Sequence, residues 1–412
     1  MAESKPSLFN RTYLKIVAWI IAIAIVLLTA GQNRSPDYLK IERYENTALY
    51  STEQSDAAYL QIGLLFRTGP AINSDQQLLQ TLLLQTVQQQ LDSIAEQALF
   101  TRLKVRLGAQ ATPDRIKVSI AILKKYSDQP EEIRKVTESL IQQLQDYFPR
   151  GDIEQRLNRL EAEQYLSQKD PENQLLNHFF NQLVAPASVH PLQRFSGLYR
   201  SSINPATLTL TLQGPNLETL PQILSSLLPG YQTSSTIAAT TIAPGFRRLQ
   251  PKDNQSYLLT GQALPGRQQN NFALELLAVK TLQQLLQQPG LPESRLTWKS
   301  LDKQGYLAMI LHGSKISAEP RINDLMQSIL GQLDDQVINT TRNKLLDDYN
   351  KRMEQTNNQL SQLDTIAFYQ LPVDDLARFE KQLTQAENQQ VKDFITDYLT
   401  SSEQYQLLLP AY

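Results

Sequence analysis

Cysteine is absent from all 412 residues, and histidine occurs only three times, at His178, His190 and His312. A chain without cysteine has no disulfide, no thiolate zinc site, no cysteine nucleophile and no lipid-modified N-terminal cysteine. An excess of charge is also missing, because 39 Lys and Arg residues face 41 Asp and Glu residues. This balance leaves no electrostatic footprint for nucleic acid, so we expect no nucleic-acid partner.

Motifs for nucleotide and nucleophile chemistry are missing as well. The chain contains no G-x-x-x-x-G-K-[ST] and no G-x-G-x-x-G, so nucleotide binding has no support. None of the three histidines lies in G-x-S-x-G or a comparable context for a catalytic triad. His178, within LLNHFFNQL, is predicted to pack on an apolar helix. The residues therefore suggest no catalytic residue and no cofactor.

The longest hydrophobic run lies near the N-terminus. Residues 16–30, IVAWIIAIAIVLLTA, carry no charge, and Tyr13 and Leu14 extend the run beyond Lys15. At about 1.5 Å per residue, residues 13–30 reach roughly 27 Å, close to the thickness of a bilayer core, about 30 Å. We therefore predict a transmembrane signal-anchor at 13–31, with a cytoplasmic segment at 1–12 and a juxtamembrane segment at 32–40.

Basic residues set the expected orientation of this segment. Lys5, Arg11 and Lys15 all lie on its N-terminal side. The positive-inside rule then places the N-terminus in the cytoplasm and the body of the chain outside. We expect a single-pass protein of the bacterial inner membrane with a periplasmic body. The alternative is a secreted or periplasmic protein released by signal cleavage, because Leu-Thr-Ala-Gly at 28–31 is a passable cleavage site.

Beyond Lys40 the chain reads as two similar halves. TVQQQL at 86–91 matches TLQQLL at 281–286, Arg102-Leu103 matches Arg295-Leu296, and LQD at 144–146 matches LDD at 333–335. In both halves a strand precedes a helix, a pair of strands and another helix. In the first half we expect strands at 47–51, 59–67, 103–107, 116–123 and 207–213, and helices around 78–91 and 131–148. In the second half we expect strands at 256–261, 296–300, 306–312 and 404–409, and helices at 272–287 and 321–333.

This pattern predicts the domain organisation. Strands gathered in a sheet with helices packed on it make an α+β sandwich. We place the first half-domain at 41–228 and the second at 247–412. The stretch between them, 229–246, has no charge and contains Pro-Gly at both ends, which is typical of a linker.

Several segments resemble one known family in order and spacing. They are LLFRTG (64–69), the helix after it, LGA (107–109), EAEQYLSQKDP (161–171), VHPLQRFSG (189–197), NPATLTLTLQG (204–214) and SYLLTGQALPGR (256–267). Together these segments resemble the insulinase/pitrilysin family of metallopeptidases, which includes the mitochondrial processing peptidase, across about residues 41–412. The resemblance implies two homologous insulinase-like α/β sandwich half-domains, preceded here by one N-terminal transmembrane helix.

The family's zinc motif is not present in this chain. Active members carry H-x-x-E-H on the helix after the first strands, where two imidazoles bind Zn²⁺ and the glutamate activates water. The resemblance places Thr81 and Gln85 at the ligand positions and Leu84 at the base position, and no His or Glu occurs from Gln76 to Leu91. Glu163 falls near the family's third ligand. Because a lone carboxylate does not hold zinc, we expect no bound metal. We expect Glu163 to be a solvent-exposed helix residue.

The family's substrate-binding pair is retained only in part. Active members place an arginine seven residues before a tyrosine beside the bound peptide. Here Lys299 stands seven residues before Tyr306. Lysine keeps the charge but lacks the bidentate fork of arginine. Lys299 and Tyr306 are therefore candidate peptide-binding residues, and the alternative is a β-hairpin with an aromatic residue packed on its sheet.

The residues and the resemblance suggest three functions. The first is a membrane-anchored pseudo-peptidase that binds a peptide or protein ligand, or serves as the non-catalytic partner of a zinc-bearing insulinase-family subunit. The second is a stand-alone scaffold of the cell envelope with no peptidase partner. The third is a cryptic enzyme with metal ligands recruited from elsewhere in the chain. Of these we expect the first, because the repeat is intact and the zinc ligands are absent.

Overall fold

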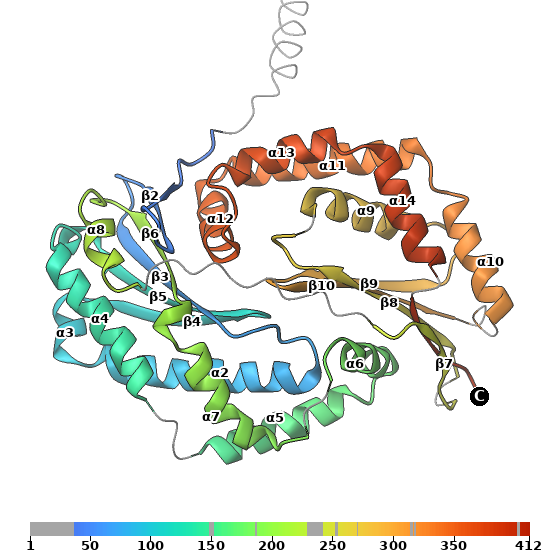
Figure 1. Cartoon of the computed structure of the whole chain (residues 1–412), viewed down its shortest axis with the longest axis horizontal. Helices are drawn as coiled ribbons and strands as arrows, with labels where there is room; N and C mark the ends of the chain where they lie inside the picture. The colour runs from blue at the N-terminus through green and yellow to red at the C-terminus, as the bar shows by residue number, and fades with distance from the viewer. Residues whose placement is uncertain are drawn as a thin grey trace, which may run out of the picture. The chain divides into compact units, whose positions relative to one another are not determined.

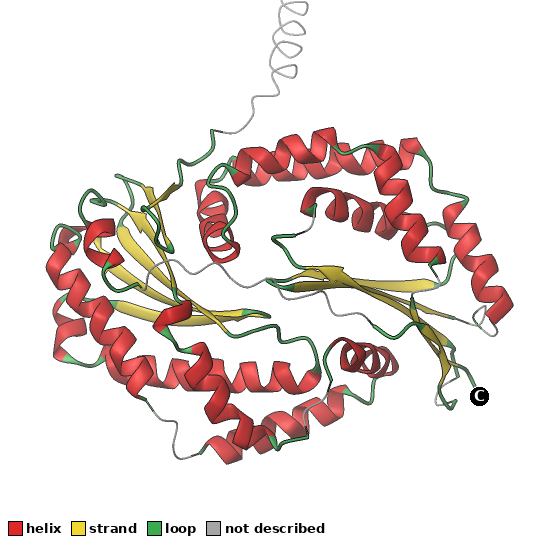
Figure 2. Cartoon of the chain, viewed as in Figure 1, coloured by secondary structure: helices red, strands yellow, loops and turns green. Residues whose placement is uncertain are grey.

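Two β-sheets organise the chain in the computed structural model, and five strands of the first follow the same order as the five strands of the second (Figures 1 and 2). The structure describes residues 37–412 except 148–151, 186–187, 229–241, 252–253, 270, 314–315, 317–318 and 402–403. Residues 38–412 form one compact unit. In the described part of the chain no helix is long and apolar enough to cross a membrane. The predicted anchor at 13–31 lies outside the described residues, so it stays a prediction.

The first half builds a six-stranded sheet in the order β1-β2-β6-β3-β5-β4. Its strands are β1 (Glu42–Arg43), β2 (Leu49–Glu53), β3 (Tyr59–Arg67), β4 (Arg106–Thr112), β5 (Arg115–Leu123) and β6 (Thr209–Gly214). Its helices are α2 (Ser74–Ala95), α3 (Ala98–Arg102), α4 (Pro130–Asp146), α5 (Ile153–Ser167), α6 (Pro171–Leu183), α7 (Pro191–Ser202) and α8 (Leu220–Ser225). Every helix except α6 contributes residues to one large core on one face of this sheet.

The second half repeats the arrangement with a five-stranded sheet in the order β7-β11-β8-β10-β9. Its strands are β7 (Gly245–Arg248), β8 (Tyr257–Pro265), β9 (Glu293–Ser300), β10 (Gln304–His312) and β11 (Tyr405–Leu409). Its helices are α9 (Phe272–Leu285), α10 (Glu319–Leu330), α11 (Asp335–Met353), α12 (Thr356–Tyr369), α13 (Asp375–Gln385) and α14 (Asn388–Thr400). One pair is parallel in each sheet at the same place, β2 with β6 and β7 with β11. These two equivalent sheets agree with the repeat predicted from the sequence.

One helix of each half packs on the sheet of the other half. Helix α6 places Phe179 and Phe180 against Tyr306 and Tyr405 of the second sheet. Helix α12 places its apolar residues against the first sheet, including Tyr50 and Leu65. Each sheet is therefore covered on one face by its own helices and on the other by a helix from the opposite half.

Two equivalent glycines allow these helices to approach. A Cβ on Gly261 of β8 would lie 2.3 Å from a ring carbon of Phe179 on α6. A Cβ on Gly63 of β3 would lie 2.3 Å from Thr211 Oγ1 and 3.3 Å from Asp364 Oδ1 on α12. At Gly261 the missing side chain leaves room for α6, and at Gly63 it leaves room for Thr211 of the neighbouring strand β6 as well as for α12.

Three expected boundaries differ from the structure. The strand expected at 103–107 is wrong, because α3 ends at Arg102 and β4 begins only at Arg106. Lys104 lies between them in the left-handed region, with φ of 50°, which interrupts an extended chain. Strand β7 begins at Gly245, inside the stretch expected to be linker. The segment expected to be juxtamembrane joins the body at Tyr38, whose hydroxyl donates to Glu380 over 2.9 Å.

Candidate binding site between the two halves

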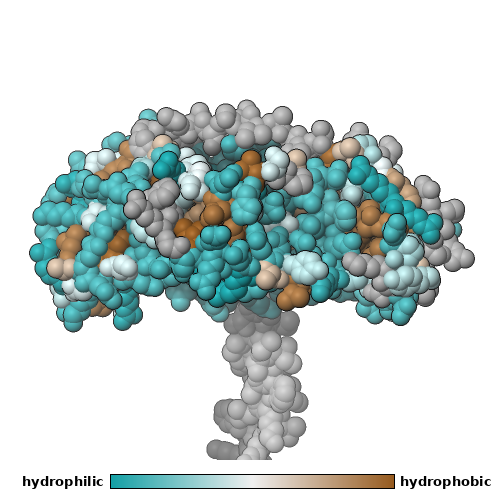
Figure 3. All heavy atoms as spheres, turned by 90° about the horizontal axis from the view of Figure 1, so that it is seen from below, coloured by the Kyte–Doolittle hydropathy of each residue, from teal (hydrophilic) through white to brown (hydrophobic). Residues whose placement is uncertain are grey.

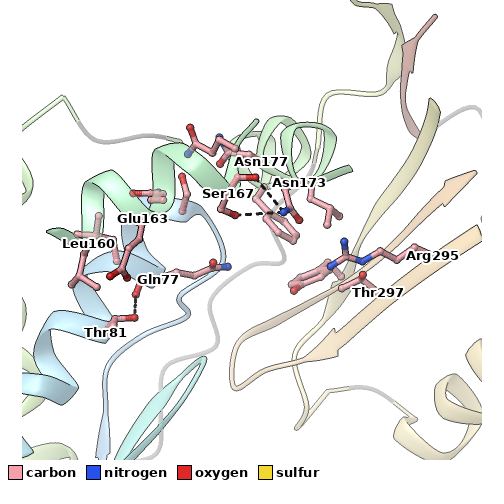
Figure 4. A pocket seen from close by; sticks show the side chains of 16 residues that line it. Gln77, Thr81, Leu160, Glu163, Ser167, Asn173, Asn177, Arg295 and Thr297 are labelled. Atoms are coloured by element: carbon pink, nitrogen blue, oxygen red, sulfur yellow. Dashed lines mark hydrogen bonds between the residues drawn. The ribbon is translucent and has the colours of Figure 1, made fainter. Parts of the chain in front are cut away.

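A cavity of about 520 Å³ lies between the first half and the edge of the second sheet (Figure 4). Helices α2, α5 and α6 form one wall, and strands β9 and β10 form the other. Hydroxyl and amide side chains dominate the helical wall: Ser74, Gln77, Thr81, Gln164, Ser167, Gln168, Asn173 and Asn177. The cavity is therefore rich in groups that pair with a peptide backbone and poor in groups that ionise near neutral pH.

Helix α2 presents a polar face to this cavity because its apolar face is buried. Asn73 caps the helix in a capping box with Gln76. Leu79, Leu82, Leu83, Val87 and Leu91 recur at helical spacing, and each is at most 3 % exposed. That stripe fixes the rotation of the helix, which leaves Gln77 and Thr81 on the cavity side (Figure 4).

The structure brings only some of the expected zinc-motif positions to the cavity. Thr81 and Glu163 line it, whereas Leu84 packs against the first core and Gln85 is not among the lining residues. Gln77, one turn before Thr81, lines the cavity instead. The i, i+4 pair that faces Glu163 is thus Gln77 and Thr81. Which residues of α2 line the cavity depends on the position of the helix relative to α5, and the sequence does not contain this information.

These side chains do not fit a zinc ion. The Gln77 amide donates to Ile72 O over 2.8 Å, and the Thr81 hydroxyl donates to Gln77 O over 2.9 Å. Glu163 lies 3.5 Å from Arg159 on the same helix. No group of three His, Cys, Asp or Glu residues suited to a metal occurs in the described part of the chain. An amide, a hydroxyl and one carboxylate are a poor donor set for Zn²⁺, so these residues do not support a zinc-dependent reaction in the cavity.

The candidate peptide-binding pair lies on the opposite wall. Tyr306 and Lys299 are direct cross-strand partners of β10 and β9, so both side chains lie on the same face of the sheet. Tyr306 is buried against Phe179 and Phe180 and lines the cavity. Burial raises the pKa of its hydroxyl to about 12, so the group stays a neutral donor and acceptor. Tyr306 therefore does both: it packs between its sheet and α6, and it borders the cavity.

Strand β9 contributes a basic residue that the sequence analysis missed. Arg295 lines the cavity and forms an ion pair with Glu172 of α6 at 3.1 Å. Lys299 is exposed and is not among the lining residues. Period-two alternation along β9 places Arg295, Thr297 and Lys299 on one face, and this pattern could have identified Arg295.

The outer edge of β9 carries free backbone groups. β9 is the last strand of its sheet and pairs only with β10. Leu301 N–H donates to Gln304 O at the hairpin end. The backbone N–H and C=O groups of every second residue before Leu301 therefore point to β10, and those of the residues between them point outward. Among the described residues, the outward-facing Ser294, Leu296 and Trp298 have no backbone hydrogen bond. This edge can accept another strand.

The three histidines lie apart from the cavity walls. His178 lies on the apolar helix α6, but its side chain is exposed, so the prediction that it is a packing residue is wrong. His190 Nδ1 caps α7 by accepting from Leu192 N–H at 3.3 Å. His312, at the end of β10, lies 3.3 Å from Glu293. None of the three has the neighbours of a catalytic triad in the described part of the chain.

The surface seen from below in Figure 1 is mainly hydrophilic (Figure 3). Hydrophobic residues on this face occur in separate small patches and do not form a continuous area. Tyr165 and Leu166, at the end of α5, are large hydrophobic side chains with more than half of their area exposed. Scattered exposure of this kind is ordinary for a protein surface.

Comparisons with known proteins establish the fold. No family model and no curated protein matches the sequence. A peptidase M16 inactive domain from Pseudomonas fluorescens superposes with a TM-score of 0.66 at 15% identity, over 91% of this chain and 98% of that one. A protease from Helicobacter pylori gives 0.61 at 12% identity, over 90% and 100%. A mutant ferredoxin protease, FusC, in complex with Arabidopsis ferredoxin gives 0.58 at 9% identity, over 92% and 47%. The chain therefore has an insulinase-like fold, as the sequence resemblance implied.

Proposed function

From this insulinase-like fold, we propose that the chain is a non-catalytic protein that binds an extended polypeptide along β9, beside the cavity between its halves. The observation that carries the proposal is the free outer edge of β9 next to an amide-rich cavity. A polypeptide added to a sheet edge gains main-chain hydrogen bonds, and pockets beside the edge select its side chains. Binding without cleavage follows from the residues at Gln77, Thr81 and Glu163.

The side chains of β9 suggest which polypeptides would bind. Arg295 and Lys299 place positive charge on the cavity face of the strand. Leu296 and Trp298 point to the opposite face, where they pack against the second core. A bound strand alternates its side chains in the same way. Acidic residues at alternate positions, with apolar residues between them, would therefore match β9.

N-methylated peptides test the binding mode on the unaltered protein. A fluorescent peptide of alternating acidic and apolar residues is titrated against the full-length protein in detergent, and polarisation gives the Kd. N-methyl groups on one alternate set of residues should weaken binding at least about tenfold, because they remove the bonds to β9. The same groups on the other set should change Kd little. Equal effects of both sets would contradict strand addition.

The place of the protein in the cell forms the second part of the proposal. The hydrophobic run at 13–30 and the basic residues before it support an anchored, exported body. We place it beside a zinc-bearing insulinase-family subunit that would cut what this chain holds. Affinity purification from native membranes, with mass spectrometry and metal analysis of the same sample, tests this. An H-x-x-E-H homologue should co-purify, and its absence would favour the stand-alone envelope scaffold. Stoichiometric zinc in the protein purified alone would contradict the non-catalytic assignment.

A further inference from the structure

Helix α2 runs beside the edge strand of the first sheet and bonds to it at two points. The Gln88 side-chain oxygen accepts from Ala109 N–H of β4 at 3.2 Å. About two turns earlier on the helix, the Gln80 amide donates to Thr112 O at the end of the same strand. Eight residues of helix span about 12 Å, and three residues of strand span about 10 Å. Helix α2 therefore runs along β4 (Figure 1).

The Ala109 bond occupies the centre of that edge. β4 is the last strand of its sheet and pairs only with β5. Because Ala109 N–H points away from β5, Leu107 and Ala111 also face outward by the period of two. A strand added to β4 would use these three residues in succession. With Ala109 already bonded, an incoming strand would have to displace Gln88 before it could pair.

The Gln88 amide is held in this orientation from its other end. Its nitrogen donates to Asp92 Oδ1, one turn later on α2, over 3.0 Å. The oxygen is thereby directed at Ala109. Ala109 and Ala111 present only methyl groups toward α2, so the helix can approach closely. The chain thus covers the edge of β4 with a helix, one of the ways in which proteins protect a sheet edge.

The second half offers an internal comparison. In the repeat TVQQQL and TLQQLL, Gln283 of α9 corresponds to Gln88 of α2. Among the described residues Gln283 has no bond to β9, and its side-chain oxygen accepts from Lys280 on its own helix at 3.0 Å. Equivalent glutamines thus close one sheet edge and leave the other free.

We propose that Gln88 is an intramolecular lock on β4, which closes the first sheet to strand addition and directs a bound polypeptide to β9. Gln88 is then the residue that makes a two-fold repeated protein bind a strand on one side only. The part that concerns the polypeptide rests on the proposed function. The closure of β4 is a property of the chain itself and can be measured without a ligand.

Amide hydrogen exchange of the full-length protein in detergent tests the lock directly. Gln88→Met keeps the length of the side chain but removes the acceptor, so the segment that contains Ala109 should exchange about 3- to 10-fold faster. Gln283→Met is the matched control and should leave the exchange of both β4 and β9 unchanged. Unchanged exchange in Gln88→Met would overturn the proposal.

Photo-cross-linking then tests the consequence for binding. A strand-forming peptide with a photoreactive group should cross-link only to β9 in the wild type and in Gln283→Met. In Gln88→Met it should label β4 as well, and the stoichiometry should rise from one peptide toward two. Labelling of β4 in the wild type would overturn the lock. If no variant binds peptide, the proposed function fails, and the exchange rates alone decide whether Gln88 closes β4.

Discussion

Replacing Gly261 by alanine should break the contact between α6 and the second sheet. The added Cβ would lie 2.3, 2.5 and 2.8 Å from three ring carbons of Phe179. That ring is fully buried and is bordered by Phe180, Tyr306 and Tyr405. Three aromatic rings pack against it, so the clash must displace these rings, the helix or the strand.

Overpacking of a close-packed core costs about 1–3 kcal/mol, and we expect Gly261→Ala to reach the upper part of this range. Truncating the ring in Phe179→Ala costs about 3–5 kcal/mol, but it leaves room for the new methyl group. In the double variant the alanine at 261 should therefore cost close to nothing. The coupling between the two changes is then about 2–3 kcal/mol, far outside the error of additivity for independent sites, about 0.5 kcal/mol.

Urea unfolding of the four proteins, followed by circular dichroism, gives this cycle. Gly63→Ala is the matched control because Gly63 is the equivalent position of the first sheet, where a Cβ would meet Thr211 Oγ1 of β6 and not the ring of Phe179. Gly63→Ala should destabilise the protein on its own, and its loss of unfolding free energy should simply add to that of Phe179→Ala. If Gly261→Ala and Phe179→Ala were simply additive, the ring would not be what Gly261 accommodates, and the inferred contact between α6 and β8 would be refuted.

Four further predictions concern Leu83, Gln85, the Arg67–Asp302 ion pair and Tyr306. Leu83→Asp should lower the free energy of unfolding, measured in urea, by more than about 4 kcal/mol because it places a carboxylate at a fully buried site. Gln85→His should give no peptidase activity with added zinc, because a single imidazole that does not line the cavity completes no metal site. Arg67→Ala should lower the free energy of unfolding by about 3–5 kcal/mol, because it leaves the carboxylate of Asp302, 2.8 Å away and 13 % exposed, buried without its partner. Adding Asp302→Asn to this variant should restore part of the stability, and no restoration would contradict the prediction. Tyr306 ionises in the folded state at pKa of about 12 and in the unfolded state near about 10, so stability should fall by about 2 kcal/mol as pH rises through that window, and Tyr306→Phe should lose less.

The sequence predicted the elements whose apolar pattern follows from their own sheet. Strand β3 was expected at the bounds that it has, and α2 was expected from its leucine stripe. Strand β4 was missed because its residues after Leu107 are no larger than threonine or glutamine and carry no apolar side chain beyond alanine. Those small side chains exist because α2 lies against them, which is a tertiary fact that periodicity does not contain.

The sequence predicted which kinds of side chain face the cavity, and it predicted only some of their positions. The loss of zinc ligands could be read from the absence of His and Glu along α2, whichever residues face the cavity. That Gln77 and Thr81 face it depends on how α2 sits against α5, and that Arg295 borders it depends on α6 packing on the second sheet. Both contacts join segments far apart in the chain, and a single sequence without homologues does not reveal them.

The reciprocal placement of α6 and α12 has a consequence for how such a chain can change over time. Neither half contains all the apolar surface that covers its sheet, because α6 of the first half packs on the second sheet and α12 of the second half packs on the first. A half on its own would leave one face of its sheet uncovered and one apolar helix without the surface that it packs on. A deletion that removes either half would therefore expose apolar surface of the other, so a change that shortens the chain cannot remove one half and leave the other stable.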